Sequence, residues 1–160
     1  MKKKKIIIIM STLIVVVLLI TGIIAIIKNK KQPAPSTPTN TVQESQIKNV
    51  KDFVGELEDG TKVNTNAKLK TPSTLGDYSI DNIRLTMKNG ISTFRATATN
   101  NSNAQTELKE VTLVLLNENG EEMVTAHGIL NQAAPGASQE LNISVTSDYI
   151  HAAGYKLSEK

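Results

Sequence analysis

A run of uncharged, mostly aliphatic residues near the amino end places the strongest constraint on the fold of this chain. It extends over 22 residues, from Ile6 to Ile27, and is interrupted only by one serine, two threonines and one glycine. As an α-helix, which rises about 1.5 Å per residue, it would extend about 33 Å and cross a hydrocarbon core of roughly 30 Å. In lipid a single segment satisfies its backbone hydrogen bonds only as a helix, even when many of its residues are β-branched. The sequence therefore predicts a transmembrane helix over residues 6–27, with the lipid bilayer as its partner.

The charges on either side of this segment predict its orientation. Residues 1–5 form a basic amino terminus with four lysines, and Lys28, Lys30 and Lys31 follow the segment. Since the more positive flank usually stays in the cytoplasm, we expect residues 1–5 inside and the C-terminal domain outside the cell membrane. A cleaved secretory signal is the alternative, but its apolar part spans only about 7 to 15 residues and ends at a small-x-small site. The longer run, which ends in Ile-Ile-Lys, favours an uncleaved anchor and a single-pass protein.

The following residues, 28–46, have the composition of a spacer. Lysines are followed by Pro33, Pro35 and Pro38 among Ser, Thr, Asn and Gln, so the stretch has almost nothing to bury. Such a segment is extended and holds the next domain away from the bilayer. We therefore expect a Lys- and Pro-rich linker over residues 28–46 and one folded domain over residues 47–160.

Charge and composition exclude several classes of function. The formal net charge of +3 arises from seven lysines in residues 1–31, because the remainder carries 11 basic against 15 acidic side chains, or −4. The basic average therefore does not indicate a nucleic-acid partner, and none is expected. The absence of cysteine excludes disulfides, thiolate metal sites and cysteine nucleophiles.

Two interpretations are open for residues 47–57. The apolar residues of this stretch recur at spacings of three and four, which would place them on one face of a short amphipathic helix: Ile47, Val50, Val54 and Leu57. An edge strand is the alternative. In either case the turn-forming residues Glu58-Asp59-Gly60 end the element.

After Gly76 the apolar pattern changes to a period of two. Ile83, Leu85 and Met87 alternate with polar residues, as do Phe94, Ala96 and Ala98, and the tight-turn dipeptide Asn89-Gly90 lies between the two runs. Val111–Leu116 is apolar on both faces, which favours a central strand. Further strands and turns follow at Asn117–Gly120, Met123–His127, Pro135-Gly136, Leu141–Thr146 and Tyr155–Leu157. Short strands separated by turns predict a mainly β, antiparallel sandwich or barrel.

Three short pieces of this pattern carry a resemblance to a known family. They are Ala98–Ser102, Leu113–Asn117 running into Gly120, and Pro135–Ser138. In order and spacing they resemble the small bacterial extracytoplasmic immunoglobulin-like domains of the FxLYD type, over residues 78–146. Leu115 matches that signature identically, while Leu113, Leu116 and Asn117 stand for its Phe, Tyr and Asp. The resemblance implies an antiparallel immunoglobulin-like β-sandwich outside the cytoplasm, with no active site.

Candidate catalytic and metal-binding residues are few. His127 and His151 are the only histidines, and Asp148 precedes His151 by three residues. A zinc site needs three or four ligands, usually with a closely spaced pair, and neither histidine has such a set. The acid-rich turn Asn117–Glu122 lacks the register of a calcium loop, and no serine lies in a nucleophile motif. We therefore expect no catalytic, cofactor-binding or metal-ligating residue and no enzyme. A metal-dependent binder or hydrolase that uses the Asp148/His151 region is the alternative.

The function that the sequence favours is non-catalytic binding in the cell envelope. We expect a protein partner there, contacted by the loops Asn100–Thr106 and Asn131–Ala137, because loops vary while a sheet holds them in place. Pairing of a partner strand with an exposed sheet edge is the second expected mode.

Overall fold

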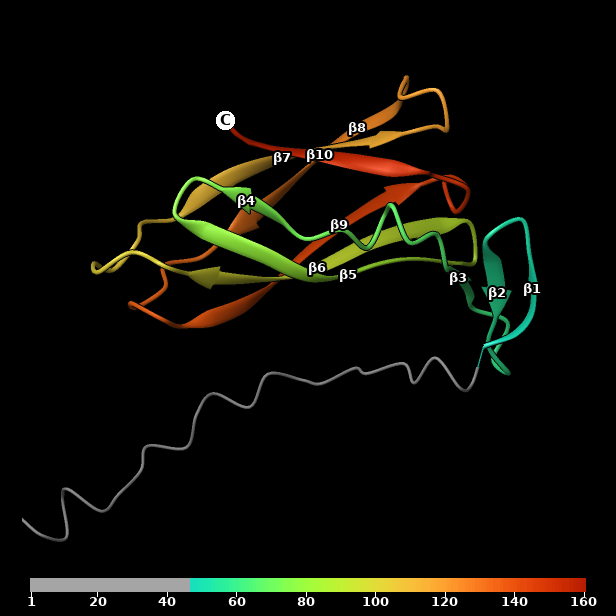
Figure 1. Ribbon diagram of the computed structural model, residues 1–160, viewed down its shortest axis with the longest axis horizontal. Coiled ribbons are helices and arrows are strands. Elements are labelled where there is room, and N and C mark those ends of the chain that lie inside the picture. The colour runs from blue at the N-terminus through green and yellow to red at the C-terminus, as the bar shows by residue number, and fades with distance from the viewer. Residues whose placement is uncertain (1–46) are drawn as a thin grey trace, which may run out of the picture. The chain divides into compact units, whose positions relative to one another are not determined.

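Residues 47–160 are described by the computed structural model of the protein and form ten β-strands (Figure 1). The strands are Lys48–Lys51 (β1), Val54–Glu56 (β2), Lys62–Asn64 (β3), Ser73–Leu75 (β4), Tyr78–Lys88 (β5), Ile91–Asn100 (β6), Lys109–Leu116 (β7), Glu122–Leu130 (β8), Ser138–Thr146 (β9) and Gly154–Glu159 (β10). The predicted basic terminus, membrane helix and linker, residues 1–46, lie outside the described residues. Within residues 47–160 no helix is long and apolar enough to cross a membrane.

The strands form two antiparallel sheets that pack on one another. The larger sheet has seven strands in the order β1-β2-β3-β5-β6-β9, with β4 paired to β5, and the smaller has the order β10-β7-β8. The long β5–β6 hairpin sets the register of the larger sheet, from Tyr78 opposite Asn100 to Lys88 opposite Ile91. The prediction of a mainly β, antiparallel, sandwich-like domain is therefore confirmed.

The core lies between the two sheets because one face of each long strand is apolar. In β6, Phe94, Ala96 and Ala98 are buried, and the residues between them are half-buried. The ring of Phe94 lies 5.3 Å, centroid to centroid, from the ring of Tyr155 on β10, so this aromatic pair connects the sheets. Strand β7 lies between β10 and β8, which confirms its predicted central position.

The hairpin turn at Asn89-Gly90 is also confirmed. Both residues have positive φ angles, 51° and 77°, and they join Lys88 directly to Ile91, the paired ends of β5 and β6. A two-residue turn of this kind matches the right-handed twist of the strands that it connects.

The helix considered for residues 47–57 is wrong, and the strand alternative is correct. Strands β1 and β2 form a hairpin in which Lys51 pairs with Val54, because Asp52 and Phe53 both adopt positive φ angles, 50° and 62°, and turn the chain back. The spacing of three and four arose from two short strands rather than from one helical face. Gly55 also disfavours a helix. Because glycine has no Cβ, the Ile47 side chain can pack against its Cα, where a Cβ atom would collide with it.

Strands β3 and β4 were not predicted. Each has three residues, too few to display a period of two. Both are held by pairing with β5, a contact between distant segments that a local pattern does not reveal.

An ion pair between the β2–β3 turn and the end of β5 gives a pH-dependent prediction. Asp59 accepts hydrogen bonds from Lys88 Nζ and from the backbone N–H of Thr61. These bonds, chiefly the one from Lys88, favour the charged carboxylate and lower the pKa of Asp59 from 3.8 to about 2. Because the folded-state pKa lies below the unfolded value, the associated stability is present above about pH 4 and is lost as the pH falls towards about 2.

Replacing Lys88 by methionine should raise the pKa of Asp59 towards 3.8, because the charge and the main hydrogen-bond donor are removed while the aliphatic stem remains. The Thr61 hydrogen bond should keep it below that value. The measurement is the ¹³C chemical shift of the Asp59 carboxyl group as a function of pH, in wild type and in Lys88→Met. Equal midpoints in the two proteins would contradict the assignment.

Candidate functional site

The connections between strands gather at two ends of the domain. Because paired strands are antiparallel, the connections at residues 89–90, 117–121 and 147–153 lie at one end, which we call the hairpin end (Figure 1). The β6–β7 and β8–β9 connections lie at the other end, which we call the loop end. Each end is built from segments that are distant in the sequence.

The loop end contains the two loops that the sequence predicted as a contact surface. Asn100, which is fully buried, donates from Nδ2 to the carbonyl oxygens of Ala104 and Ala133 at 2.9 and 3.0 Å. Its Oδ1 accepts from the backbone N–H of Ser102 at 2.9 Å, and the N–H of Thr106 donates to Ala133 at 2.9 Å. The structure thus brings the two loops together and fastens one to the other. Their contact with a partner stays a prediction.

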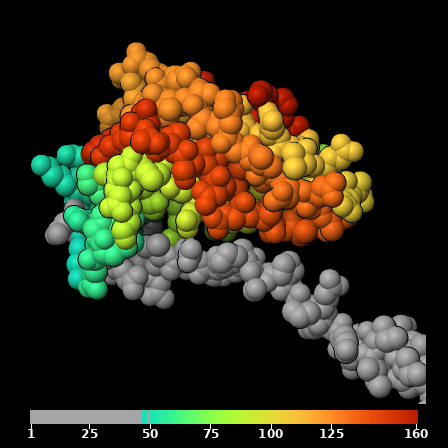
Figure 2. Space-filling model, turned by 180° about the vertical axis from the view of Figure 1, so that it is seen from behind, coloured from blue at the N-terminus to red at the C-terminus, as the bar shows by residue number. Residues whose placement is uncertain are grey.

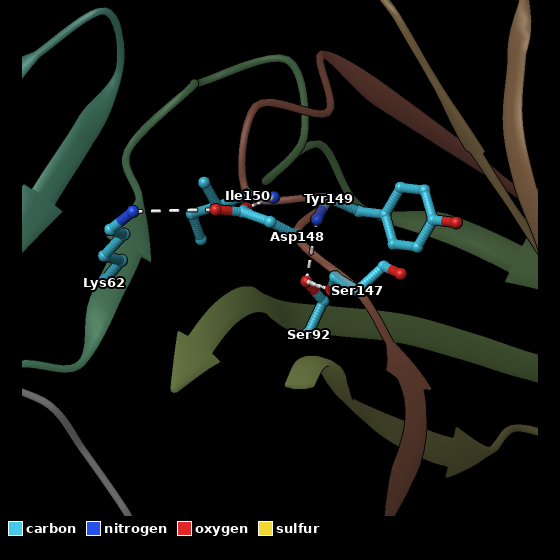
Figure 3. Close-up of polar contacts among 6 residues, drawn as sticks. All are labelled: Lys62, Ser92, Ser147, Asp148, Tyr149 and Ile150. Atoms are coloured by element: carbon cyan, nitrogen blue, oxygen red, sulfur yellow. Dashed lines mark hydrogen bonds and ion pairs between the residues drawn. The ribbon is translucent and has the colours of Figure 1, made fainter. Parts of the chain in front are cut away.

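The Asp148 region lies at the hairpin end, and its polar groups are used to hold the β9–β10 loop (Figure 3). Asp148 Oδ1 accepts from the backbone N–H of Ile150 at 3.0 Å, and its Oδ2 lies 3.6 Å from Lys62 Nζ. Ser92 beneath the loop donates from Oγ to the Ser147 carbonyl at 2.8 Å and accepts from the N–H of Tyr149 at 2.9 Å. Asp148 and Ser92 therefore position the backbone of this loop.

The two histidines are not brought together. His127 lies on β8, where its Nδ1 is 3.2 Å from the Thr112 hydroxyl on the outer face of the smaller sheet. His151 lies in the β9–β10 loop and is exposed. Among residues 47–160, no three His, Asp or Glu side chains lie close enough to hold a metal ion. The geometry therefore gives no support to the alternative of a metal site or hydrolase around Asp148 and His151.

A hollow of about 470 Å³ opens at the hairpin end. Its walls come from the β1–β2 turn, the segment after β3, the β7–β8 turn and the β9–β10 loop. The segments from the two halves of the chain lie side by side here, teal to green for β1–β3 and orange to red after β8 (Figure 1, Figure 2). We call it the Phe53 hollow. The side chains that line it include Asp52, Phe53, Asn66, Glu118, Asn119 and His151.

Asn64 builds one wall of the Phe53 hollow. It is 2% exposed, and its Nδ2 donates to the carbonyl oxygens of Ile150 and Ala152 at 2.6 and 2.8 Å. Its Oδ1 accepts from the backbone N–H of Asn66 at 2.8 Å. One buried amide thus fixes the segment after β3 to the β9–β10 loop.

Asn66 carries an unused donor into the same wall. The residue is 9% exposed, and its Oδ1 accepts from the backbone N–H of Lys68 at 2.9 Å. Its Nδ2 has no acceptor among the described residues. This nitrogen is not among the buried polar atoms of residues 47–160 that lack a partner, so it is open to solvent and carries no penalty for an unmade hydrogen bond. The side chain is therefore available to a ligand.

Phe53 is held exposed in a strained turn. Its side chain is 54% exposed, and its φ of 62° is one that Asn or Gly adopts far more readily than an aromatic residue does. Left-handed backbone costs such a residue about 1 kcal/mol or more. The Phe53 carbonyl accepts from the N–H of Thr65 at 2.7 Å, so the turn is tied to the wall that Asn64 and Asn66 form. Strain and exposure together are typical of functional positions rather than of residues selected for stability.

A second hollow, of about 380 Å³, shares Asn117 and Glu118 with the first. Tyr155 lines it, but its hydroxyl is already hydrogen-bonded to the Thr71 carbonyl at 2.8 Å and to Ser73 Oγ at 2.9 Å. Burial raises the pKa of Tyr155, and the hydrogen bond to Ser73 partly offsets this. This hollow offers a ligand fewer free polar groups than the Phe53 hollow does.

No family model matches the chain. The curated proteins and the solved structures yield no match either. The resemblance to FxLYD-type domains stays a prediction, and the candidate site rests on the geometry described above.

Proposed function

We propose that the chain is a membrane-anchored, extracytoplasmic binding module without catalytic activity. Residues 6–27 anchor it in the cell membrane as a single helix, residues 28–46 form the spacer, and the domain of residues 47–160 meets a partner in the cell envelope. The uncharged run of the sequence and the lysines around it support the anchor and its orientation.

The Phe53 hollow is the observation that carries the binding function. It places an exposed aromatic ring, held in a strained turn, beside the Asn66 amide nitrogen, which is open to solvent and donates to no described group. Neither feature stabilises the fold, and both gain a role if a ligand occupies the hollow.

An immunoglobulin-like type of sandwich belongs to the same proposal. Strands β5, β6 and β9 are neighbours in one sheet and β10, β7 and β8 in the other, so the chain crosses between sheets after β6, β8 and β9. Immunoglobulin-like domains also alternate between two antiparallel sheets through such crossings. The spacing of Ala98–Ser102, Leu113–Asn117 and Pro135–Ser138 supports this assignment.

Protease treatment of intact cells that express the full chain tests the proposed location. Cleavage in the spacer, residues 32–46, should release the domain and leave residues 1–27 with the membrane. In the control, a cytoplasmic protein of the same cells stays intact until the membrane is permeabilised. A domain that resists the protease until permeabilisation would contradict the orientation. A mature chain free of membranes that lacks its first thirty or so residues would contradict the anchor.

A further inference from the structure

We propose that the Phe53 hollow binds a neutral saccharide segment. This inference rests on the proposed binding function and names the class of ligand. It follows from the polar groups that are free in the hollow, from their charge and from the exposed ring.

The free polar groups form a mixed set of donors and acceptors. The Asn66 amide offers a donor, the carboxylates of Asp52 and Glu118 offer acceptors, and the side chains of Asn119 and His151 offer both. Within residues 47–160, the side chains of Asp52, Glu118, Asn119 and His151 make no hydrogen bond or ion pair. Asn66 makes one hydrogen bond through its side chain, at Oδ1. A sugar hydroxyl both donates and accepts, so adjacent hydroxyls on one ring match such a set.

Charge and polarity argue against other ligand classes. No lysine or arginine of the described residues lines the hollow, whereas two carboxylates do, so a phosphate, sulfate or carboxylate group would meet like charge. An apolar ligand would take water away from these carboxylates and amides without replacing its hydrogen bonds. A neutral, hydroxyl-rich ligand avoids both penalties.

Phe53 supplies the apolar part of the site. The C–H face of a pyranose ring can pack on an exposed phenyl ring, which buries apolar surface on both sides. The volume of the hollow, about 470 Å³, lies within the roughly 300 to 1,000 Å³ that is usual for small-molecule sites.

Binding is tested with the full chain in lipid nanodiscs, so that no sugar-based detergent competes. The probes are triacetylchitotriose and maltotriose as neutral saccharides, trigalacturonate as an anionic one, and a Gly-Ser peptide. Saturation-transfer difference NMR against empty nanodiscs detects contact, and calorimetry gives the dissociation constant. We expect at least one neutral trisaccharide to bind and trigalacturonate to fail.

Variants at position 53 link binding to the hollow. Phe53→Gly should weaken binding by about tenfold or more, which corresponds to about 1.4 kcal/mol. It should also raise the melting temperature, since glycine adopts the positive φ of this turn without strain. Phe53→Tyr keeps the ring and should keep the affinity. Leu108→Ala, which removes an exposed apolar side chain at the loop end, is the matched control and should bind as wild type does.

Three outcomes would overturn the inference: no contact with any neutral saccharide at about 10 mM, well above the affinity range of specific sites; equal affinity in wild type and Phe53→Gly; or contact with the peptide alone. The third outcome would leave the proposed binding function standing while excluding a saccharide. Protection of the domain from protease in intact cells would contradict the proposed location and leave the saccharide result unaffected.

Discussion

Replacement of Phe94 by alanine is expected to lower the free energy of unfolding by about 3 to 5 kcal/mol. Phe94 is 1% exposed and lies in β6, between Leu85 of β5 and Ile143 of β9. Its ring also meets Tyr155 of the opposite sheet, so truncation leaves a cavity at the junction of both sheets. Urea unfolding of wild type and variant, followed by circular dichroism, measures the difference.

The second phenylalanine provides the matched control. Phe53 has the same side chain but is 54% exposed, and its backbone is strained. Phe53→Ala should therefore change the free energy of unfolding by less than about 1 kcal/mol. Similar losses in Phe94→Ala and Phe53→Ala would contradict the assignment of one ring to the core and the other to the surface.

Replacement of Asn100 by aspartate is expected to cost about 3 to 5 kcal/mol of stability at pH 7, although the two side chains have the same shape. The change substitutes an oxygen for the amide nitrogen that donates to Ala104 and Ala133. One oxygen of the buried carboxylate would then face two carbonyl oxygens, and the hydrogen bonds that Ser102 donates to the other oxygen do not balance the charge. These two carbonyls belong to the two loops of the loop end, so both loops lose their common anchor.

The pH dependence of this variant distinguishes charge from shape. Burial beside carbonyl oxygens should raise the pKa of the new aspartate above the unfolded value of about 3.9. A carboxyl group whose pKa is higher in the folded than in the unfolded protein lowers the free energy of unfolding as the pH rises. The loss develops between the pKa of the unfolded state and the pKa of the folded state. The stability difference between Asn100→Asp and wild type should therefore be smaller at pH 4 than at pH 7, when both are unfolded with urea at each pH. Asn103→Asp, at an exposed position of the same loop, should show little change at either pH. A deficit that does not vary with pH would mean that lost hydrogen bonds, and not the charge, dominate.

Sequence patterns predicted the long strands because each has a local cause. The alternation in residues 83–99 reflects one buried and one solvated face, and the Asn89-Gly90 turn needs only two residues with positive φ. The helix prediction for residues 47–57 was wrong because four apolar residues of a short hairpin repeat by coincidence at helical spacing. The signal that favoured strands was Gly55, which weakens a helix and allows the close approach of Ile47.

The Phe53 hollow could not be predicted by the same reasoning. Its walls come from four segments that only the tertiary fold brings together, and the unused donor of Asn66 is visible only when its neighbours are known. One local signal was present: the strand pairing of Lys51 with Val54 requires Asp52-Phe53 to occupy a turn that usually holds Asn-Gly. An aromatic residue in such a turn is unusual, and this marks position 53 as a candidate functional residue.

The hydrogen bonds of Asn64 also determine when the Phe53 hollow can form in a nascent chain. Their acceptors, at Ile150 and Ala152, are 86 and 88 positions further along the chain. During vectorial synthesis at roughly 5 to 20 residues per second, the hollow therefore stays unformed for several seconds after Asn64 has been made. If the domain is exported as proposed, the hollow is complete only after the β9–β10 loop has also crossed the membrane.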